Sequence, residues 1–371
     1  MGTGHLQKLT MPKWGLSMTQ GTVVDWLVES GQEIVVGTEV VEVETEKILN
    51  AVESPVEGRM LRLVAKAGDE LPVGALLAVV GDDDVPDAQI DEFVEQCATI
   101  LETEEDQIDE PISESVEVGG RTLQYLKRGE GGRPLVLIHG FGGDLNNWMF
   151  NFDALAASRE VFVIDLPGHG GSTKDAGDGS IDSLAKTVGG FLDAVGIDQA
   201  HLAGHSLGGA IATDLALNHP SRVLSLTLIA SAGLGEEINH AYIDGFVRAS
   251  RRNQLKPFLQ QLFADPDLVT RQLVEDILKF KRIDGVPKAL TAIAQQLVAE
   301  GKQTSNYRDC LADISVPILV LWGVKDQIIP VSHAEGLPAS VQTEILNDHG
   351  HMLHVEAAGE VNRLMEEFLH N

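Results

Sequence analysis

The sequence predicts a multidomain protein, with an all-β barrel in its N-terminal part and an α/β domain with a helical cap in its C-terminal part. Three observations lead to this fold class. The first 80 residues contain an internal repeat of short apolar alternations, which is typical of strands and turns. An acidic tract follows, and beyond it apolar runs alternate with helical patterns, which indicates a mostly parallel sheet covered on both faces. The 371 residues, 43% of them hydrophobic, suffice for two domains.

The composition limits the class of function. The chain has 56 acidic and 27 basic residues, and its net charge of −29 argues against binding to nucleic acid or to an anionic membrane. Cys97 and Cys310 lie far apart and predict ordinary reduced thiols, so no metal site is expected. Met1–Gly15 has no apolar signal-peptide core, and no apolar stretch approaches the roughly 20 residues that span a bilayer. We therefore expect a soluble, cytoplasmic protein.

A lysine lies between the two halves of the N-terminal repeat. Aligning the chain with itself after a shift of 37 residues matches, among other pairs, Gly21 with Gly58 and Gly31 with Gly68. Two similar halves of about four short strands predict a flattened barrel with pseudo-twofold symmetry. Lys47 falls where the chain must reverse between the halves, so we expect it at an exposed hairpin tip. An ordinary surface lysine in a turn is the simpler interpretation of this residue alone.

Residues 5–82 resemble the lipoyl/biotinyl carrier family. The resemblance is carried by Met11-Pro12, Gly21, Gly31, Glu46-Lys47 and Pro55-Val56-Glu57-Gly58. It implies that Lys47 is amide-linked to lipoic acid. Biotinyl domains place methionine on both sides of the lysine, whereas Thr45-Glu46-Lys47-Ile48 has none, which favours lipoate over biotin. Such an arm carries an acyl group as a thioester, and tethering raises the effective concentration of that group at a second site.

Residues 83–114 are predicted to form an acidic linker with a short amphipathic helix. The apolar residues at helical spacing are Ile90, Phe93, Val94, Cys97 and Leu101, and Pro86-Asp87 is a plausible start. Asp82–Glu117 holds 15 acidic residues and no Lys or Arg. The basic subunit-binding domain that multienzyme acyltransferases usually carry at this place is therefore not predicted. Two interpretations stay open, a helix that packs weakly on a neighbouring domain and a docking helix for a partner enzyme.

Residues 115–371 predict the α/β domain. Candidate buried strands are residues 135–138, 161–165, 200–204, 224–229, 318–322 and 343–346, and helical patterns cover residues 181–195 and 210–218. Gly119-Gly120 predicts a hairpin turn in an antiparallel start over residues 116–126. Residues of about 234–312 are mainly helical and would cap the site. The cap aromatics are candidates for an acyl or coenzyme A pocket, although core packing is the simpler role: Tyr242, Phe246, Phe258 and Phe263.

A serine motif and two later residues indicate nucleophilic catalysis. Gly204-His205-Ser206-Leu207-Gly208 follows a predicted strand and opens a helix, the context that the G-x-S-x-G motif requires. Asp326 and His351 follow later predicted strands, in the chain order Ser, Asp, His of α/β-hydrolases. Alternatives for the acid are Asp348 and Asp313, and the main alternative for the base is His349. Only Asp326 follows a strand end directly at the expected place in the order.

Residues of about 115–371 resemble the α/β-hydrolase family. The resemblance implies a catalytic triad of Ser206, Asp326 and His351. The stretch His139-Gly140-Phe141-Gly142-Gly143 is similar to the oxyanion loop of the family, with amide donors expected from Phe141 and Leu207. We expect His139 and His205 to be structural, bonding the backbone around the loop and the serine.

A lipoyl carrier fused to an α/β-hydrolase domain resembles the acyltransferase components of acetoin dehydrogenase systems. The resemblance implies a dihydrolipoyllysine-residue acetyltransferase that passes acetyl from the lipoyl arm to coenzyme A in acetoin catabolism. It also implies two partners, a thiamine-dependent acetoin-cleaving component and a flavin dihydrolipoyl dehydrogenase, and a homo-oligomer stays open. The alternatives are a thioesterase or esterase with a carrier domain and a non-catalytic lipoyl carrier scaffold. Transfer through an acetyl-serine and direct transfer to coenzyme A both agree with the sequence.

Overall fold

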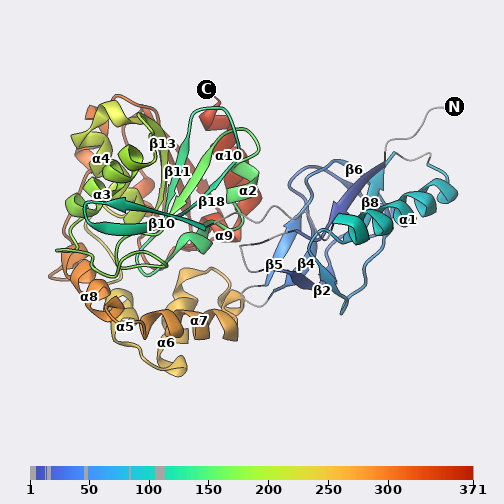
Figure 1. Cartoon of the computed structure of the whole chain (residues 1–371), viewed down its shortest axis with the longest axis horizontal. Helices are drawn as coiled ribbons and strands as arrows, with labels where there is room; N and C mark the ends of the chain where they lie inside the picture. The colour runs from blue at the N-terminus through green and yellow to red at the C-terminus, as the bar shows by residue number, and fades with distance from the viewer. Residues whose placement is uncertain are drawn as a thin grey trace. The chain divides into compact units, whose positions relative to one another are not determined.

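The protein divides into two compact units near residue 110 (Figure 1). The computed structural model describes residues 6–12, 14, 18–45, 49–82, 85–104 and 113–370, with backbone alone for residues 98–104. The predicted fold class is confirmed in both parts, with two small sheets in the first unit and one large mixed sheet with helices in the second.

The first unit contains two four-stranded sheets. Their orders are β1-β8-β6-β3 and β5-β4-β2-β7. The strands are β1 (Leu6–Thr10), β2 (Gln20–Trp26), β3 (Glu33–Ile34), β4 (Glu39–Glu44), β5 (Leu49–Glu53), β6 (Gly58–Leu63), β7 (Glu70–Pro72) and β8 (Leu76–Gly81). The 37-residue shift carries β2, β3 and β4 onto β6, β7 and β8, so the two sheets have the same order with equivalent strands exchanged. This arrangement is the pseudo-twofold barrel that the repeat predicts.

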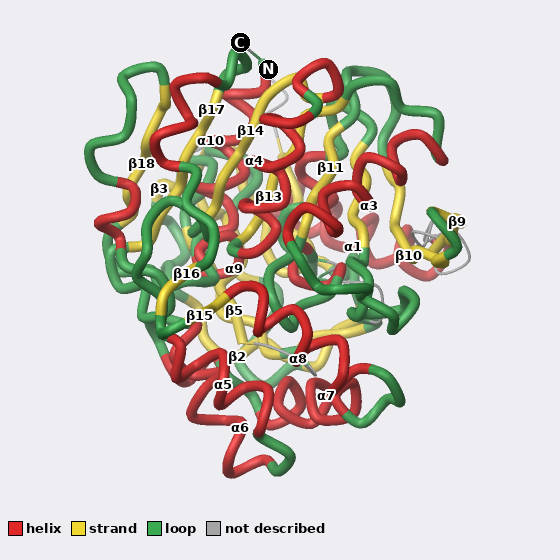
Figure 2. Tube along the Cα trace, turned by 90° about the vertical axis from the view of Figure 1, so that its left-hand side faces the viewer, coloured by secondary structure: helices red, strands yellow, loops and turns green. Residues whose placement is uncertain are grey.

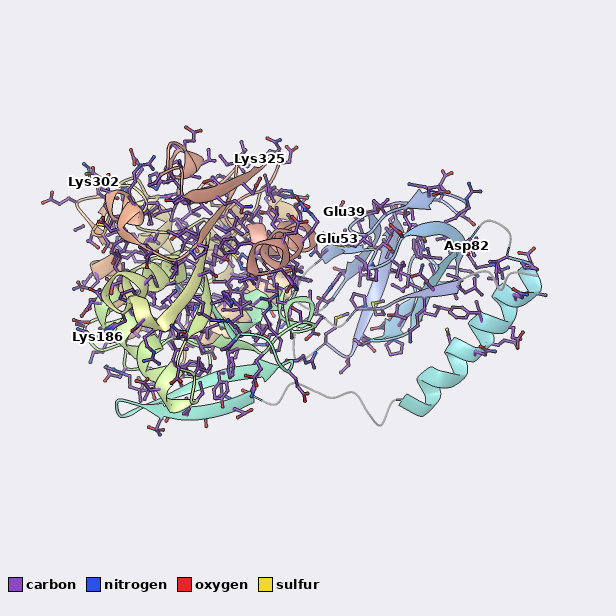
Figure 3. All side chains as sticks on the ribbon, turned by 90° about the horizontal axis from the view of Figure 1, so that it is seen from above. Glu39, Glu53, Asp82, Lys186, Lys302 and Lys325 are labelled. Atoms are coloured by element: carbon purple, nitrogen blue, oxygen red, sulfur yellow. The ribbon has the colours of Figure 1, made fainter. Side chains whose placement is uncertain are left out.

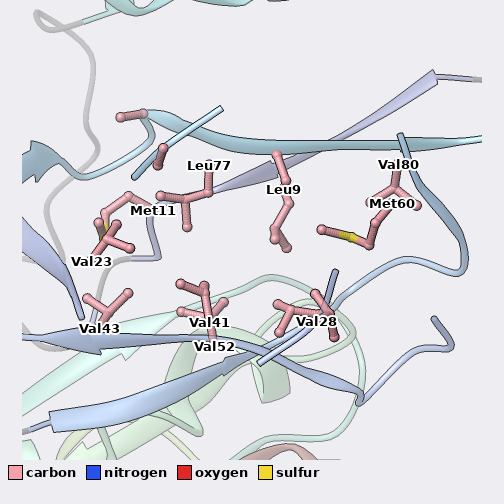
Figure 4. Close-up of a cluster of buried hydrophobic side chains, with 14 of the residues drawn as sticks. Leu9, Met11, Val23, Val28, Val41, Val43, Val52, Met60, Leu77 and Val80 are labelled. Carbon is pink, nitrogen blue, oxygen red and sulfur yellow. The ribbon is translucent and has the colours of Figure 1, made fainter. Parts of the chain in front are cut away.

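The core of the first unit lies between its two sheets (Figure 4). Leu9 and Leu77 come from one sheet and face Val41 and Val43 of the other, all at most 1% exposed. Burying such side chains contributes roughly 25 cal/mol for each Å² of apolar surface. A Cβ on Gly21 would lie 2.7 Å from Val43 Cγ1 on the neighbouring strand β4, so a glycine at this position leaves room for the Val43 side chain in the core.

A helix packs on the first unit. Helix α1 (Asp87–Glu104) contacts β8, and Ile90 on its apolar face is 3% exposed. Arg62 binds the carboxylates of Asp91 and Asp87 at 2.6 and 3.3 Å. These contacts agree with the interpretation of a helix that packs on its neighbouring domain. They add two ion pairs that the apolar spacing did not predict.

The second unit is built on an eight-stranded sheet. Its order is β18-β17-β14-β13-β11-β12-β10-β9. The strands are β9 (Ser113–Val118), β10 (Arg121–Arg128), β11 (Leu135–Ile138), β12 (Val161–Ile164), β13 (Ala200–His205), β14 (Val223–Ile229), β17 (Ile318–Gly323) and β18 (Val341–Leu346). The strands of this sheet from β11 to β18 pair with one another in parallel. Strand β10 pairs in antiparallel fashion with β12 and with β9, which is the expected antiparallel start. Gly119 and Gly120 both have positive φ, as a two-residue hairpin turn requires.

Helices cover both faces of this sheet, because its parallel strands are apolar on both sides. Figure 1 shows α3 (Ile181–Ala194) and α4 (Leu207–Asn218) on one face. The other face carries α2 (Phe152–Leu155), α9 (Leu353–Glu356) and α10 (Ala358–Leu369). The loops that follow the parallel strands meet at the carboxyl edge, where ligands bind in such sheets.

The predicted cap is a group of four helices between β14 and β17. They are α5 (His240–Arg248), α6 (Arg252–Leu259), α7 (Arg271–Lys281) and α8 (Val286–Leu297). Figures 1 and 2 show them grouped at one end of the large sheet. A short ribbon of β15 (Val298–Ala299) and β16 (Lys302–Gln303) follows α8 and was not predicted.

Candidate active site

Strands β4 and β5 of the first unit flank the segment that contains the predicted carrier lysine. Strands β4 and β5 pair in antiparallel fashion, and the last paired residues are Glu44 and Leu49. Residues 45–48 therefore connect two adjacent strand ends. Lys47 itself lies outside the described residues. The flanking strands supply the hairpin that a carrier lysine requires, and they fit the lipoyl interpretation of this segment.

Ser206 occupies a strained turn between β13 and α4. Its backbone has φ of 52° and ψ of −116°, a conformation that residues with a side chain rarely adopt. The Ser206 amide donates to Ile229 O at 3.0 Å, and Ser206 O accepts from the amides of Gly209 and Ala232 at 3.0 Å each. These bonds hold the turn from both sides. The local geometry is the one that the G-x-S-x-G motif predicts.

Two glycines of the motif allow close backbone approach. A Cβ on Gly204 would collide with the carbonyl group of Gly208, four residues later on α4. A Cβ on Gly208 would collide with Ile138 O at the end of β11. Both positions therefore exclude larger residues for steric reasons. The strained turn at Ser206, which we call the elbow, therefore packs directly against the loop after β11.

The predicted acid and base are hydrogen-bonded to each other. His351 Nδ1 lies 2.8 Å from Asp326 Oδ2, and the two side chains are 3% and 0% exposed. The other oxygen, Oδ1, accepts from the amides of Ile328 and Ile329 at 2.8 and 3.0 Å. An imidazole that donates from Nδ1 keeps a lone pair on Nε2, the atom that acts as base in a triad.

The alternative acid does not lie in this arrangement. Asp348 is exposed, and its carboxylate pairs with Lys325 at 2.7 Å. This ion pair lowers the pKa of Asp348, first through the hydrogen bond from Lys325. Asp313 is also exposed. The geometry therefore favours Asp326 among the three candidates that the sequence offers.

His205 connects the elbow to the loop that carries His351. Its Nε2 lies 3.0 Å from His351 O, and the two ring centroids are 4.7 Å apart. Burial lowers the pKa of His205 well below its ordinary value, so the ring stays neutral and donates from Nε2. The residue before Ser206 is therefore in contact with His351. This structural role is the one expected from the sequence.

The loop after β11 presents candidate oxyanion donors. The amides of Phe141 and Leu207 donate no backbone hydrogen bond among the described residues. Leu207 is the first residue of α4, so its amide also benefits from the positive end of the helix dipole. Free amides at a helix start and on a glycine loop are the groups that bind a developing oxyanion. The structure leaves both predicted donors available.

Two buried histidines form hydrogen bonds with the backbone in and around this loop. His139 Nδ1 lies 2.8 Å from Gly140 O, and its Nε2 accepts from Leu166 N at 3.0 Å. His169 Nε2 accepts from Gly142 N at 3.1 Å. Burial lowers the pKa of both rings, that of His169 well below its ordinary value. The expected structural role of His139 is present, whereas His169 was not singled out from the sequence.

Asp165 is a second residue that sequence reasoning missed. It follows β12, and its carboxylate accepts from Leu145 N at 2.8 Å and from Gly171 N at 2.6 Å. Burial raises the pKa of Asp165 to about 7, with a further contribution from the nearby charge of Asp144. The available signal was an aspartate at the end of an apolar strand. Its carboxylate holds the chain two residues beyond the oxyanion loop, at Leu145.

The cap touches the oxyanion loop through one aromatic side chain. Phe246 is 1% exposed, and its ring centroid lies 5.7 Å from that of Phe141. Gly142 has φ of 74°, and a Cβ there would lie 2.5 Å from the Phe246 ring. Lys281 Nζ hydrogen-bonds the carbonyl group of Phe246 and lies 4.5 Å from its ring centroid. Tyr242 and Phe263 are buried, and Phe258 packs half-buried against Gly245.

The cap also holds the loop that carries His351. Glu356 accepts from Ala264 N and from Gly350 N, both at 2.6 Å. Met352 N donates to Leu262 O at 3.0 Å. One carboxylate thus joins a cap segment to the residue before His351. No local pattern predicts this contact, because Ala264 and Glu356 are about 90 residues apart in the chain.

Neither a metal-binding cluster nor a membrane-spanning helix occurs in the described ranges. Among these residues, no three His, Cys, Asp or Glu side chains are grouped so that they could hold a metal ion. None of the helices that are described is long and apolar enough to cross a membrane.

Comparison with known proteins assigns both parts of the chain. Residues 7–80 match the family model described as biotin-requiring enzyme, and residues 133–358 match that of the alpha/beta hydrolase fold. A dihydrolipoyllysine-residue acetyltransferase component of the acetoin cleaving system from Pseudomonas putida is 52% identical over 98% of this chain and 99% of its own length. A protein of the same description from Cupriavidus necator is 44% identical, over 97% of this chain and 96% of its own length.

A solved structure supports the fold of the second unit. A meta-cleavage product hydrolase from Pseudomonas fluorescens superposes with a TM-score of 0.64 at 24% sequence identity. The match covers 70% of this chain and 98% of that structure. At this level of identity the likeness bears on the fold alone.

Proposed function

The chain belongs to the family of dihydrolipoyllysine-residue acetyltransferase components of acetoin cleaving systems, and we propose that Ser206, His351 and Asp326 catalyse its acetyl transfer. The acetyl group passes from a covalently attached lipoyl group to coenzyme A. We assign the lipoyl group to Lys47, which lies in the chain between β4 and β5. The observation that carries the catalytic assignment is the buried 2.8 Å contact between His351 and Asp326, beside the strained elbow of Ser206.

The first half of the mechanism transfers acetyl to the serine. The lipoyl group supplies the acetyl group as a thioester. His351 Nε2 takes the proton of Ser206 Oγ, which attacks the thioester carbonyl carbon while Asp326 stabilises the imidazolium. The amides of Phe141 and Leu207 bind the oxyanion, each contributing about 3 kcal/mol to transition-state stabilisation. The C–S bond breaks, and His351 returns its proton to the departing sulfur.

The second half regenerates the serine. His351 takes the thiol proton of coenzyme A, and the thiolate attacks the acetyl carbonyl on Ser206. The oxyanion binds to the same two amides. The C–O bond to Ser206 breaks, and His351 returns the proton to Oγ. The products are acetyl-coenzyme A and the free serine, with no net change of protonation.

A direct transfer is the second candidate mechanism. In that case His351 deprotonates coenzyme A, the thiolate attacks the lipoyl thioester, and Ser206 only donates a hydrogen bond. Rapid quenching of the enzyme with S-acetyl-dihydrolipoamide, without coenzyme A, separates the two. We expect a peptide containing Ser206 with a mass increase of one acetyl group, absent in Ser206→Ala. A wild-type enzyme that turns over without such a peptide would require the direct route.

A thioesterase activity and a pure carrier role are tested on the same preparation. We expect loss of acetyl from S-acetyl-dihydrolipoamide to depend on coenzyme A, whereas a thioesterase releases acetate without it. Lys47→Arg is expected to abolish transfer from the attached arm and to preserve transfer from the free amide. If Ser206→Ala left both transfers unchanged, the second unit would be a scaffold.

The family also bears on the setting of the reaction. Membership in an acetoin cleaving system implies other components in a complex. We propose that these are a thiamine-dependent component that loads the arm and a flavin dehydrogenase that reoxidises it, all in the cytoplasm. Co-purification from cells grown on acetoin tests this set. If the chain were recovered after gentle lysis with neither of these two components, the proposed set of partners would be contradicted.

A further inference from the structure

A run of basic residues stands out in the cap of this acidic protein. Residues 248–256 contain Arg248, Arg251, Arg252 and Lys256 and no acidic residue, while the whole chain has a net charge of −29. We call these four residues the basic strip. They lie at the end of α5 and along α6, two helices that pack on each other. All four are exposed.

Three of the four residues of the basic strip have no acidic partner among the described residues, and the fourth has one long ion pair. Other lysines of this unit are paired, as Lys186 is with Asp182, Lys302 with Glu236 and Lys325 with Asp348, and Figure 3 labels these three lysines. Within the described ranges Arg248, Arg251 and Lys256 form no ion pair, and Arg252 approaches Glu275 only to 3.9 Å. Like charges that are close and unpaired attract an external anion.

The basic strip is close in the chain to Phe246, a cap residue that contacts the oxyanion loop. Phe246 contacts Phe141 and Gly142 of the oxyanion loop, and Arg248 follows it by two residues. Arg251 follows by five, so its Cα lies within about 18 Å of that of Phe246 even if the chain is fully extended. Lys281 fixes this end of α5 by hydrogen-bonding the carbonyls of Phe246 and Val247.

We propose that the basic strip binds the phosphate groups of coenzyme A while its thiol reaches Ser206. This inference rests on the proposed function, which requires coenzyme A at the serine. The nucleotide end of coenzyme A carries a pyrophosphate and a 3′-phosphate, and the pantetheine arm separates them from the thiol. Guanidinium groups bind phosphate with two parallel hydrogen bonds, and three of the four residues are arginines.

The charge of the rest of the protein supports this place for the nucleotide. The surface is acidic overall and repels a polyanion, so binding requires a local cationic site. An acidic protein surface is the other class of occupant that such a strip attracts. Coenzyme A is favoured because the strip follows directly on the residue that contacts the oxyanion loop.

The test compares two acyl acceptors in kinetics. The variants are Arg251→Gln and the double variant Arg248→Gln/Arg251→Gln, assayed with S-acetyl-dihydrolipoamide as donor. Coenzyme A and pantetheine, which lacks the nucleotide, are the acceptors. We expect KM for coenzyme A to rise about tenfold for each lost charged hydrogen bond. The kinetics with pantetheine should stay unchanged. Arg133→Gln is the matched control, because Arg133 is exposed and precedes β11 at the opposite edge of the sheet.

A direct binding measurement keeps the two proposals apart. We expect adenosine 3′,5′-bisphosphate to bind the wild-type full chain in calorimetry and to bind the double variant at least tenfold more weakly. Equal KM values for coenzyme A in all variants, or an equal rise with pantetheine, would overturn the inference. The same variants can be assayed with the acetylated lipoyl arm of the chain as donor. A KM that rises only with this donor would assign the strip to an acidic protein surface instead. A wild-type enzyme that acetylates neither acceptor would refute the proposed function, and calorimetry would still decide on the strip.

Discussion

His351 and Asp326 form a buried pair in which the two carboxylate oxygens have different partners. Oδ2 lies 2.8 Å from His351 Nδ1, while Oδ1 accepts from the amides of Ile328 and Ile329. Oδ1 therefore holds the loop after β17 by hydrogen bonds, and Oδ2 orients the imidazole of His351. A substitution that keeps the first oxygen and replaces the second separates the two effects.

Asp326→Asn is that substitution. Its Oδ1 still accepts from the two amides, but its Nδ2 cannot accept from His351 Nδ1, so the imidazole loses the tautomer that leaves Nε2 free. We expect kcat to fall by about 10⁴-fold, the size known for this change in a serine protease triad. The thermal midpoint should change by only a few degrees. Steady-state transfer from S-acetyl-dihydrolipoamide to coenzyme A and circular dichroism provide the two measurements.

Asp348→Asn is the matched control for this variant. Asp348 is exposed and paired with Lys325, and exposed ion pairs contribute little to stability. We expect its kcat to stay within about twofold of the wild type. A loss in Asp348→Asn as large as in Asp326→Asn would mean that the acid of the triad has been assigned to the wrong residue.

The strained backbone of Ser206 predicts that the catalytic serine lowers the stability of the second unit. With φ of 52° it adopts a conformation that costs a residue with a side chain on the order of 1–3 kcal/mol. Ser206→Gly and Ser206→Ala both remove the hydroxyl, but only glycine relieves the strain. We expect Ser206→Gly to melt about 2–4 °C above Ser206→Ala, as about 1 kcal/mol does in a domain of this size. Equal midpoints in calorimetry would argue against a strained elbow.

The sequence predicted those features that arise from local patterns. Apolar runs placed β11, β13, β14 and β17 within one or two residues, because buried parallel strands are apolar on both faces. The 37-residue repeat predicted two equivalent sheets, since similar halves bury similar faces. Asp326 and His351 each follow a predicted strand, and this placement predicted that they are close together, because parallel strands share a carboxyl edge.

The features that were missed depend on contacts between distant segments. Glu356 joins Ala264 to Gly350, and His169 accepts from Gly142 across 27 residues. Neither pattern has a local signature, because the geometry of the loops decides which amide a side chain reaches. The four cap aromatics likewise looked equivalent in sequence. Only the packing distinguishes Phe246, which touches the oxyanion loop.

Glu356→Gln tests whether the cap holds the loop of His351. The carboxylate accepts from two amides, whereas a glutamine has one acceptor oxygen, so one buried amide loses its partner at a cost of about 1–3 kcal/mol. We expect kcat/KM to fall about tenfold and the cap to be cleaved faster by trypsin. Glu360→Gln is the control, because Glu360 forms a surface pair with Arg363. Unchanged kcat/KM in Glu356→Gln would show that His351 does not depend on the cap.

Buried histidines predict a loss of stability of the second unit in acid. Burial lowers the pKa of His354 to about 3 and that of His205 well below its ordinary value. The unfolded chain therefore takes up protons near pH 6.5 that the folded protein does not bind. The free energy of unfolding should fall as pH drops below 6.5, by up to about 1.4 kcal/mol per pH unit for each such histidine. Asp165 acts in the opposite sense, because its raised pKa of about 7 adds stability as pH falls through that value.

His354→Leu isolates one of these contributions. His354 lies between Trp148 and His205, with ring centroids 4.7 and 4.5 Å away, and a leucine retains an apolar side chain in that space. We expect the free energy of unfolding, measured with urea, to fall less steeply between pH 6.5 and 4.5 than in the wild type. The difference in slope should correspond to about one proton fewer taken up on unfolding. The exposed His219→Gln should follow the wild-type slope. If His354→Leu also followed it, the buried ring would already be protonated in the folded protein, and the neutral state assigned to His354 would be wrong.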